Sequence, residues 1–140
     1  VGIVKNLSED FEFSDGSHHL VLHSGSDGDG ALFTGILVRY LAQAAMSTML
    51  SPEARSLASA LVYGSARAVW EGRREFDPTL PLNEPGIDPN EIRDRAIAIF
   101  SPKFTVSARD ALAAGKPVEL SGQLQAWMTL EAAARLSAED

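Results

Sequence analysis

The residue types that this chain of 140 residues lacks set the first limits on it. It contains no cysteine, which excludes disulfide bridges and thiolate metal sites and leaves the redox compartment open. It has no run of lysines and arginines, and its net charge of −7 would repel the phosphates of a nucleic acid. The sequence therefore does not indicate a nucleic-acid surface. No apolar run reaches the roughly 18 residues that a membrane-spanning helix needs. A length of 140 residues suits one domain, so residues 1–140 are most simply interpreted as a single domain or part of one.

Most of the chain has helical patterning. The segment from Ala31 to Leu50 is apolar except for Arg39, Gln43 and Ser47, which lie four residues apart on one narrow stripe, so we expect a core helix that is buried on most sides. Ser51-Pro52-Glu53 combines an N-cap, a proline suited to the first turn and an acidic residue. This signal predicts a second helix to about Arg73, antiparallel to the first.

The remaining elements are shorter or less regular. Asp15-Gly16-Ser17 is a turn signal, and the residues from His19 to His23 alternate like a strand, so we expect a β-hairpin near the N-terminus. The simplest pairing sets Ile3–Val4 or Glu12–Phe13 against Leu20–Leu22. Further expectations are a proline-rich loop over 76–90, a short helix over 88–98, one or two helical turns over 107–114 and a last helix over about 118–136. The fold class is all-α with a small β-hairpin.

One segment of the predicted first helix has a recognisable signature. Residues 33–41, FTGILVRYL, resemble the F-K-G-I-F-x-R-Y-L pattern of glycoside hydrolase family 76, the endo-α-1,6-mannanases. In that family the pattern also follows a short acidic, glycine-rich loop. Threonine stands at position 34, where the family usually has lysine, so a role that depends on that lysine does not carry over. The agreeing residues are Phe33, Gly35, Ile36, Arg39, Tyr40 and Leu41.

Three later segments extend the resemblance in the same order. Residues 66–73 resemble the family pattern A-x-x-x-W-x-x-R, with Trp70 at the tryptophan position. Residues 100–102 resemble a phenylalanine–glycine/serine–proline segment, although Phe104 stands where the family usually has tryptophan. Residues 123–136 resemble the closing helix of many bacterial members. Together the four segments run from about residue 25 to residue 136.

The resemblance implies a fold and an activity. Family members are (α/α)6 toroids of six helical hairpins, so this chain would be the C-terminal portion of a toroid. Its start at Val1, with no initiator methionine, fits a chain cut from something longer. The implied activity is cleavage of α-mannan or a related glycan by an extracellular or cell-surface enzyme without a cofactor. The family's acid pair is two consecutive aspartates after tryptophan in the N-terminal half. No such motif occurs here, so we assign no catalytic residue.

Candidate substrate-binding residues remain on the glycine-rich loop. Asp27 and Asp29 could accept hydrogen bonds from sugar hydroxyls, or they could satisfy turn amides and cap the helix. We expect Arg39 to be buried against a carboxylate from another helix and Tyr40 to pack with its hydroxyl on a carbonyl. Together with Phe33, these two are structural residues of the signature. Two tryptophans, Trp70 and Trp127, could stack on sugar rings, but their apolar helix faces favour core packing.

No metal site is predicted. His19 and His23 share a strand face, but two ligands without a third do not form a catalytic zinc site, and the Asp–Gly loop lacks the other ligands of a calcium loop. Two further hypotheses stay open: a non-catalytic carbohydrate-binding domain of the same fold, and an unrelated helical interaction domain. The expected partners are a polysaccharide or oligosaccharide and either the remaining N-terminal half of the toroid or a second copy. Half a toroid should leave a large apolar edge exposed.

Overall fold

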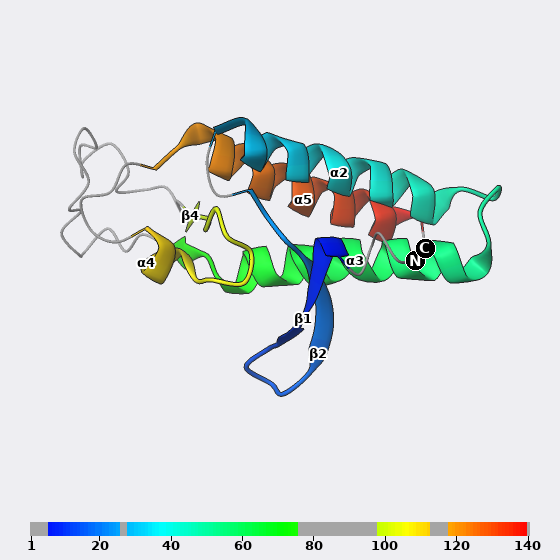
Figure 1. Ribbon diagram of the computed structural model, residues 1–140, viewed down its shortest axis with the longest axis horizontal. Coiled ribbons are helices and arrows are strands. Elements are labelled where there is room, and N and C mark those ends of the chain that lie inside the picture. The colour runs from blue at the N-terminus through cyan, green and yellow to red at the C-terminus, as the bar shows by residue number, and fades with distance from the viewer. Residues whose placement is uncertain (1–5, 26–27, 76–97, 113–117, 140) are drawn as a thin grey trace.

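The computed structural model describes residues 6–25, 28–75, 98–112 and 118–139. Three long helices form the body of this part of the chain, and a β-hairpin projects from it (Figure 1). No helix among the described residues is long and apolar enough to cross a membrane. The elements are β1 (Ser8–Glu12), β2 (His18–Leu22), α2 (Gly28–Met46), α3 (Pro52–Glu71), β3 (Arg74–Glu75), β4 (Ala98–Ile99), α4 (Ala108–Ala111) and α5 (Leu120–Ala138).

The three long helices pack against one another. Helices α2 and α5 run side by side in the same direction, and α3 runs antiparallel beneath them (Figure 1). The core lies where the three helices meet the inner end of the hairpin. The buried members of the core include Val21, Leu22, Val38, Leu61, Val62, Val69, Phe104, Ala126 and Leu136. The prediction of a mostly helical chain with a small hairpin is confirmed.

The start of α3 follows from its capping residues. Ser51 has an extended backbone, and its hydroxyl accepts a hydrogen bond from the Ala54 amide. Pro52 occupies the first turn, where its missing N–H has no helical partner to lose. Ser107 caps α4 in the same way, through the Asp110 amide. The predicted starts of both helices are therefore confirmed.

The expectation that the first helix is buried on most sides is wrong. Only five residues of α2 are buried, and all of them are on the side toward α3 and α5. On the opposite side, Phe33 is 69% exposed and Tyr40 is 64% exposed. Helix α2 therefore has more apolar side chains than the neighbouring described elements bury.

The hairpin is confirmed, but its predicted register is wrong. Glu12 pairs with His18, and Asp10 pairs with Leu20, so Glu12–Phe13 does not lie against Leu20–Leu22. The turn decides this. The Phe13 amide donates to the Ser17 carbonyl, and Gly16 adopts a φ of 82°. This short turn sets the register, because the residues on either side of it, Glu12 and His18, become the first pair of the ladder.

Other expectations lie wholly or partly outside the described residues. The alternative strand pairing through residues 3–4, and most of the proline-rich loop and short helix over 76–98, are in this group. Ala98 itself pairs with Glu75 in the short β3–β4 ladder, which the sequence analysis missed.

The hairpin packs on α3 with its backbone close to that helix. A Cβ atom built on Gly64 would lie 2.1 Å from the Leu20 carbonyl oxygen, so the helix can approach strand β2 only because this position is glycine. One residue further, the buried Ser65 hydroxyl accepts a hydrogen bond from the Leu22 amide at 3.0 Å. These contacts seal Val21 and Leu22 into the core.

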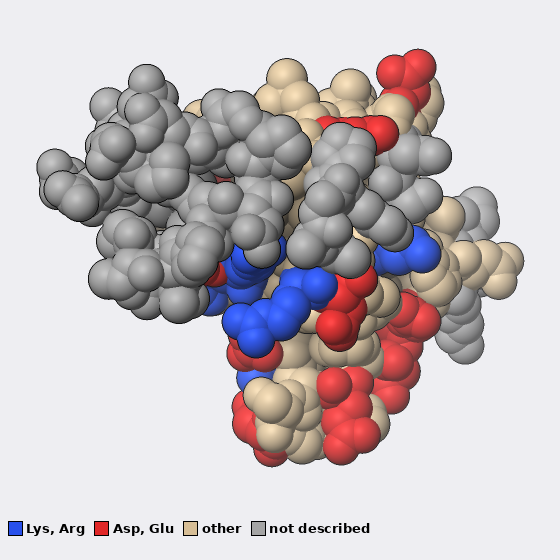
Figure 2. Space-filling model, turned by 90° about the vertical axis from the view of Figure 1, so that its left-hand side faces the viewer, with Lys and Arg blue, Asp and Glu red and all other residues tan. Residues whose placement is uncertain are grey.

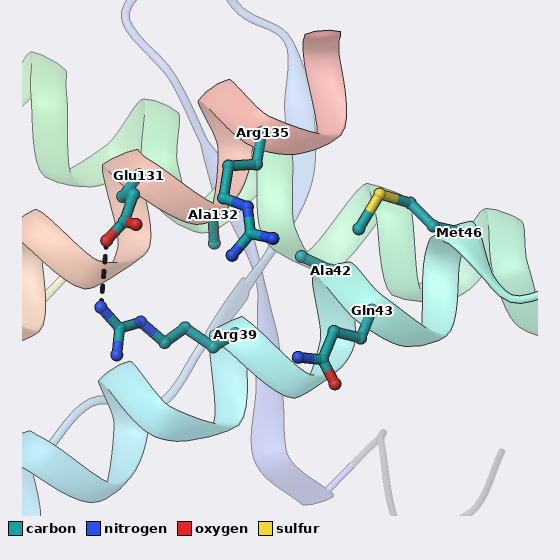
Figure 3. A pocket seen from close by; sticks show the side chains of 7 residues that line it. All are labelled: Arg39, Ala42, Gln43, Met46, Glu131, Ala132 and Arg135. Atoms are coloured by element: carbon teal, nitrogen blue, oxygen red, sulfur yellow. Dashed lines mark hydrogen bonds and ion pairs between the residues drawn. The ribbon is translucent and has the colours of Figure 1, made fainter. Parts of the chain in front are cut away.

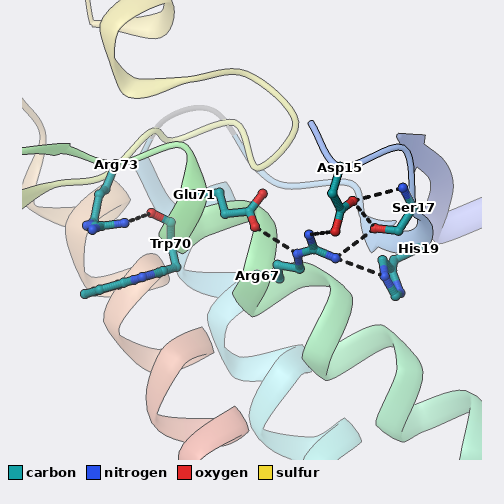
Figure 4. A network of polar contacts seen from close by, with 7 residues as sticks. All are labelled: Asp15, Ser17, His19, Arg67, Trp70, Glu71 and Arg73. Carbon is teal, nitrogen blue, oxygen red and sulfur yellow. Dashed lines mark hydrogen bonds and ion pairs between the residues drawn. The ribbon is translucent and has the colours of Figure 1, made fainter. Parts of the chain in front are cut away.

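Arg67 joins the hairpin turn to α3 (Figure 4). Its guanidinium donates to the Asp15 carboxylate at 2.8 Å, to the Ser17 hydroxyl at 2.9 Å and to the Glu71 carboxylate at 2.9 Å. It also lies 4.2 Å from the centre of the Phe13 ring, a cation–π contact. The turn is thus held to the helix by one side chain.

The turn carboxylate should make stability depend on pH. Hydrogen bonds from the Ser17 hydroxyl and amide, followed by that from Arg67, hold the pKa of Asp15 well below its ordinary value. A lowered pKa stabilises the fold above the unfolded pKa of about 4, and this contribution is lost as the pH falls further. We expect Asp15→Asn to lower the urea midpoint at neutral pH, with the deficit shrinking at acidic pH.

A pH series of urea denaturation curves tests this expectation, with Glu9→Gln on the exposed strand β1 as the control. A deficit for Asp15→Asn that stays constant from neutral to acidic pH would contradict it.

Candidate functional site

A hollow of about 300 Å³ opens between α2 and α5 (Figure 3). It is near the lower limit of small-ligand sites, which begin at roughly 300 Å³. Charged and amide side chains surround it, with small residues at its base. Its lining residues are Arg39, Ala42, Gln43, Met46, Glu131, Ala132 and Arg135.

Small residues let the two helices approach at this place. A Cβ atom on Gly35 would lie 2.9 Å from Met128 Sδ and 3.2 Å from Met128 Cβ. Ala42 and Ala132 continue the seam, and both are buried. At the start of α2, the Gly28 amide donates to the Glu119 carboxylate at 3.2 Å. The seam therefore holds α2 and α5 in a fixed parallel register.

One ion pair crosses the mouth of the hollow. Arg39 Nη2 lies 3.0 Å from Glu131 Oε2, and the two side chains are 51% and 40% exposed. The expected partner for Arg39, a carboxylate from another helix, is confirmed, whereas its expected burial is wrong. Arg135 extends from α5 toward α2 beside this pair, and Gln43 is on α2 across from it (Figure 3). The hollow thus presents several donors and the acceptors of one paired carboxylate.

Two exposed aromatic rings are on α2 and α5 near the hollow in sequence, but neither lines it. Trp127 precedes Glu131 by one turn and is 67% exposed, and Tyr40 precedes Gln43 by three residues. The expected core packing is wrong for Trp127, because most of its side chain is exposed. It is also wrong for Trp70, which is exposed at the end of α3.

Of the two predicted substrate-binding aspartates, the structure describes only Asp29, and it does not line this hollow. Asp27 lies outside the described residues. Asp29 is exposed in the first turn of α2, where an acidic group complements the helix dipole. Fourteen residues of helix, roughly 20 Å, separate it from Gln43. Of the predicted residues that the structure describes, only Arg39 lines the hollow.

The sequence analysis missed Glu131 and Arg135. A signal for them exists, because each of the two helices carries a polar pair four residues apart within an apolar segment: Arg39 with Gln43, and Glu131 with Arg135. Such pairs occupy one helix face, and α2 and α5 turn these faces toward a common opening.

Among the described residues, no three histidine, aspartate or glutamate side chains are placed to hold a metal ion. His18 instead forms an exposed pair with Asp10 at 2.8 Å, which raises the pKa of His18. His19 lies 3.2 Å from Arg67. The histidines of the hairpin therefore serve local contacts.

Comparisons with known proteins identify no relative. No protein-family model matches the sequence, and neither a curated protein nor a solved structure matches it. The resemblance to family 76 thus depends on the four short segments alone, and the function rests on what the residues can do.

Proposed function

We propose that this chain is the C-terminal part of a glycoside hydrolase that resembles the α-1,6-mannanases of family 76. In this proposal the three long helices form part of a helical toroid. The carboxylate pair comes from a part of the enzyme outside this chain. The hollow between α2 and α5 binds sugar hydroxyls of the glycan.

The observation that carries the proposal is the meeting of two motif segments. Residues 33–41 and residues 123–136 each resemble the family, and they are far apart in the sequence. In the structure they pack against each other, with Gly35 against Met128 and Arg39 paired with Glu131. Both Gly35 and Arg39 contact α5, so packing against this helix explains why the signature has a glycine and an arginine at these positions.

The chemistry of the hollow fits glycan binding and not bond cleavage by itself. Arg135 and Gln43 line the hollow and can donate to hydroxyl oxygens. Tyr40 and Trp127 do not line it, but they are exposed on the same two helices and offer faces on which sugars stack. Glycoside hydrolysis needs two carboxyl groups, about 5–5.5 Å apart in retaining enzymes and wider apart in inverting ones. Among the residues that line the hollow, Glu131 has the one carboxylate, and Arg39 is paired with it.

The decisive experiment is made on the natural gene product that contains this sequence. Its intact mass and its release of reducing ends from α-1,6-mannan are measured, with an α-1,4-glucan as the comparison polymer. The proposal expects a longer protein with an upstream aspartate pair and cleavage of the mannan alone. A product that ends with these 140 residues and releases no sugar would overturn it.

Within that natural product, Gln43→Ala tests the hollow. Removal of a neutral hydrogen bond to a sugar hydroxyl should raise KM by up to about tenfold, with kcat nearly unchanged, because the contact exists equally in the ground state and the transition state. Ser56→Ala, an exposed change on α3, is the control. An unchanged KM for Gln43→Ala would remove the hollow from the substrate site.

A helical interaction domain is the second candidate, because the apolar surface that half a toroid would leave exposed could equally bind a partner protein. Large apolar side chains are exposed along α2 and α5, more than scattered surface residues account for. They are Phe33, Ile36, Tyr40, Leu120, Leu124 and Trp127. Inactivity toward every glycan, together with a stable complex through this face, would select this candidate.

A further inference from the structure

Strand β1 forms one edge of the hairpin, and its outward backbone groups are unpaired. A hydrogen bond joins the Phe13 amide to the Ser17 carbonyl at the turn. Because bonded and non-bonded pairs alternate along an antiparallel ladder, the register turns the N–H and C=O groups of Asp10 and Glu12 away from β2. These groups form no hydrogen bond with any residue that the structure describes. The edge of β1 can therefore accept another strand.

The opposite edge of the hairpin is closed by α3. The Leu22 amide donates to the Ser65 hydroxyl at 3.0 Å, and the Leu20 carbonyl lies against Gly64. The rest of the hairpin projects from the three long helices (Figure 1). A strand that joins this sheet would thus pair with β1 and not with β2.

The open edge carries negative charge. Residues 6–25 contain no lysine or arginine, and Figure 2 shows acidic side chains gathered on the hairpin at the bottom of the view. Glu9 and Glu12 are exposed and form no ion pair with a described residue. Asp10 is paired with His18, but 64% of its side chain remains exposed. These carboxylates favour a positively charged partner.

A second hollow, of about 210 Å³, lies where the end of β1 meets the end of α3. We call it the hairpin hollow, and none of the described residues that line it also lines the hollow between α2 and α5. It is smaller than the roughly 300 Å³ at which small-ligand sites begin, so one apolar side chain of a bound protein segment suits it better than a separate small molecule. Its apolar wall includes Phe11, Phe13, Ala68 and Phe104.

We propose that β1 is a docking edge for an extended, basic segment of a partner protein, which adds a strand to the hairpin. The backbone of this segment pairs with the outward groups of Asp10 and Glu12. Lysines or arginines at alternate positions face the two carboxylates, and one apolar side chain enters the hairpin hollow. The inference does not depend on the proposed glycan activity.

A second copy of the chain does not fit this edge. Two β1 strands side by side would place the carboxylates of Glu9, Asp10 and Glu12 against one another, and like charges across a strand pair are destabilising. Charged side chains on an edge strand oppose self-pairing in this way. A basic strand would instead neutralise the same carboxylates.

Synthetic peptides added to the chain test the inference, with NMR spectra and amide hydrogen exchange as the measurements. The peptide has about six residues, the length of an ordinary strand, with lysine at alternate positions, one leucine between them and threonine elsewhere. A comparison peptide has glutamate in place of each lysine. We expect binding of the lysine peptide alone, weakened by salt, and protection of the Asp10 and Glu12 amides from exchange. A loose attraction between charges would leave these outward amides unprotected and would overturn strand pairing.

Glu12→Gln removes one carboxylate from the edge at little risk to the fold, because the side chain is exposed and forms no ion pair with a described residue. It should weaken binding of the lysine peptide by about two- to fivefold, the range of an exposed ion pair. Glu53→Gln removes the same charge from the first turn of α3 and should leave the affinity nearly unchanged. Equal losses in the two variants would show that only the net charge matters, and would overturn the site.

Altered peptides test the backbone and the hairpin hollow without any change to the protein. Alternate amides of an added strand face β1, so N-methylation of that set should weaken binding by about tenfold or more. Methylation of the other set should have little effect. Equal losses in the two methylated peptides would overturn strand pairing, and an affinity unchanged when alanine replaces the leucine would remove the hairpin hollow from the docking edge. Chemical-shift changes centred on α2 and α5 would assign the interaction to the apolar side chains there and refute the proposal.

Discussion

Replacement of Gly64 by alanine is expected to lower the free energy of unfolding by about 3–5 kcal/mol, among the largest effects of a single substitution. The added Cβ would lie 2.1 Å from the Leu20 carbonyl oxygen, which belongs to backbone and not to a flexible side-chain end. Strand β2 would have to retreat from α3. Its retreat would expose Val21 and Leu22, which are now almost fully buried, and break the bond from the Leu22 amide to Ser65.

Urea denaturation followed by circular dichroism measures this loss. Gly122→Ala is the matched control, because Gly122 is also a buried helical glycine, but its Cβ would meet only Pro102 atoms, at 3.4 Å and beyond. The control should be neutral or stabilising by up to about 1 kcal/mol, since alanine favours a helix over glycine. Equal effects of the two substitutions would show that hairpin and helix do not approach as described.

Substitution of Gly35 by leucine should cost about 3 kcal/mol, at the upper end of the range for over-packed cores. Leucine is a good helix former, so a loss must come from packing and not from helix propensity. Already the first added carbon would lie 3.2 Å from Met128 Cβ and 3.4 Å from Gln125 Cα. The remaining atoms would force α2 away from α5 and widen the hollow that Arg39 and Glu131 close.

The control is Gly30→Leu on the same helix, where the added Cβ would meet only the Gly25 Cα atom, at 3.8 Å. Chemical denaturation reports the stability difference between the two variants. An increase of the Arg39–Glu131 separation in a crystal structure of Gly35→Leu would show that the seam positions the hollow. A Gly35→Leu variant as stable as Gly30→Leu would refute the close seam between the helices.

Local signals in the sequence predicted the secondary structure well. Ser51 and Ser107 mark helix starts because a hydroxyl satisfies an amide three residues later, a bond that needs no distant partner. Asp15-Gly16-Ser17 marks the turn for the same reason, since its bonds are local. The strand register failed because it depends on how the strands leave that turn, which hydrophobic alternation alone does not reveal.

Burial was predicted less well, because it depends on neighbours. The apolar content of α2 indicated a helix enclosed on most sides, and the same reasoning placed Trp70 and Trp127 in the core. The structure exposes Phe33, Tyr40 and both tryptophans. A helix face is buried only where another element covers it, and composition does not name that element.

The sequence by itself determined the helices, their caps, the hairpin turn and the absence of cysteine chemistry, since each follows from residues close together in the chain. Only the tertiary structure decided the two hollows. It brings Arg39 to Glu131 across 92 positions, and Phe11 and Phe13 to Phe104 from a separate segment. Such groupings depend on the close approach of elements that are distant in sequence, which glycines such as Gly35 and Gly64 permit.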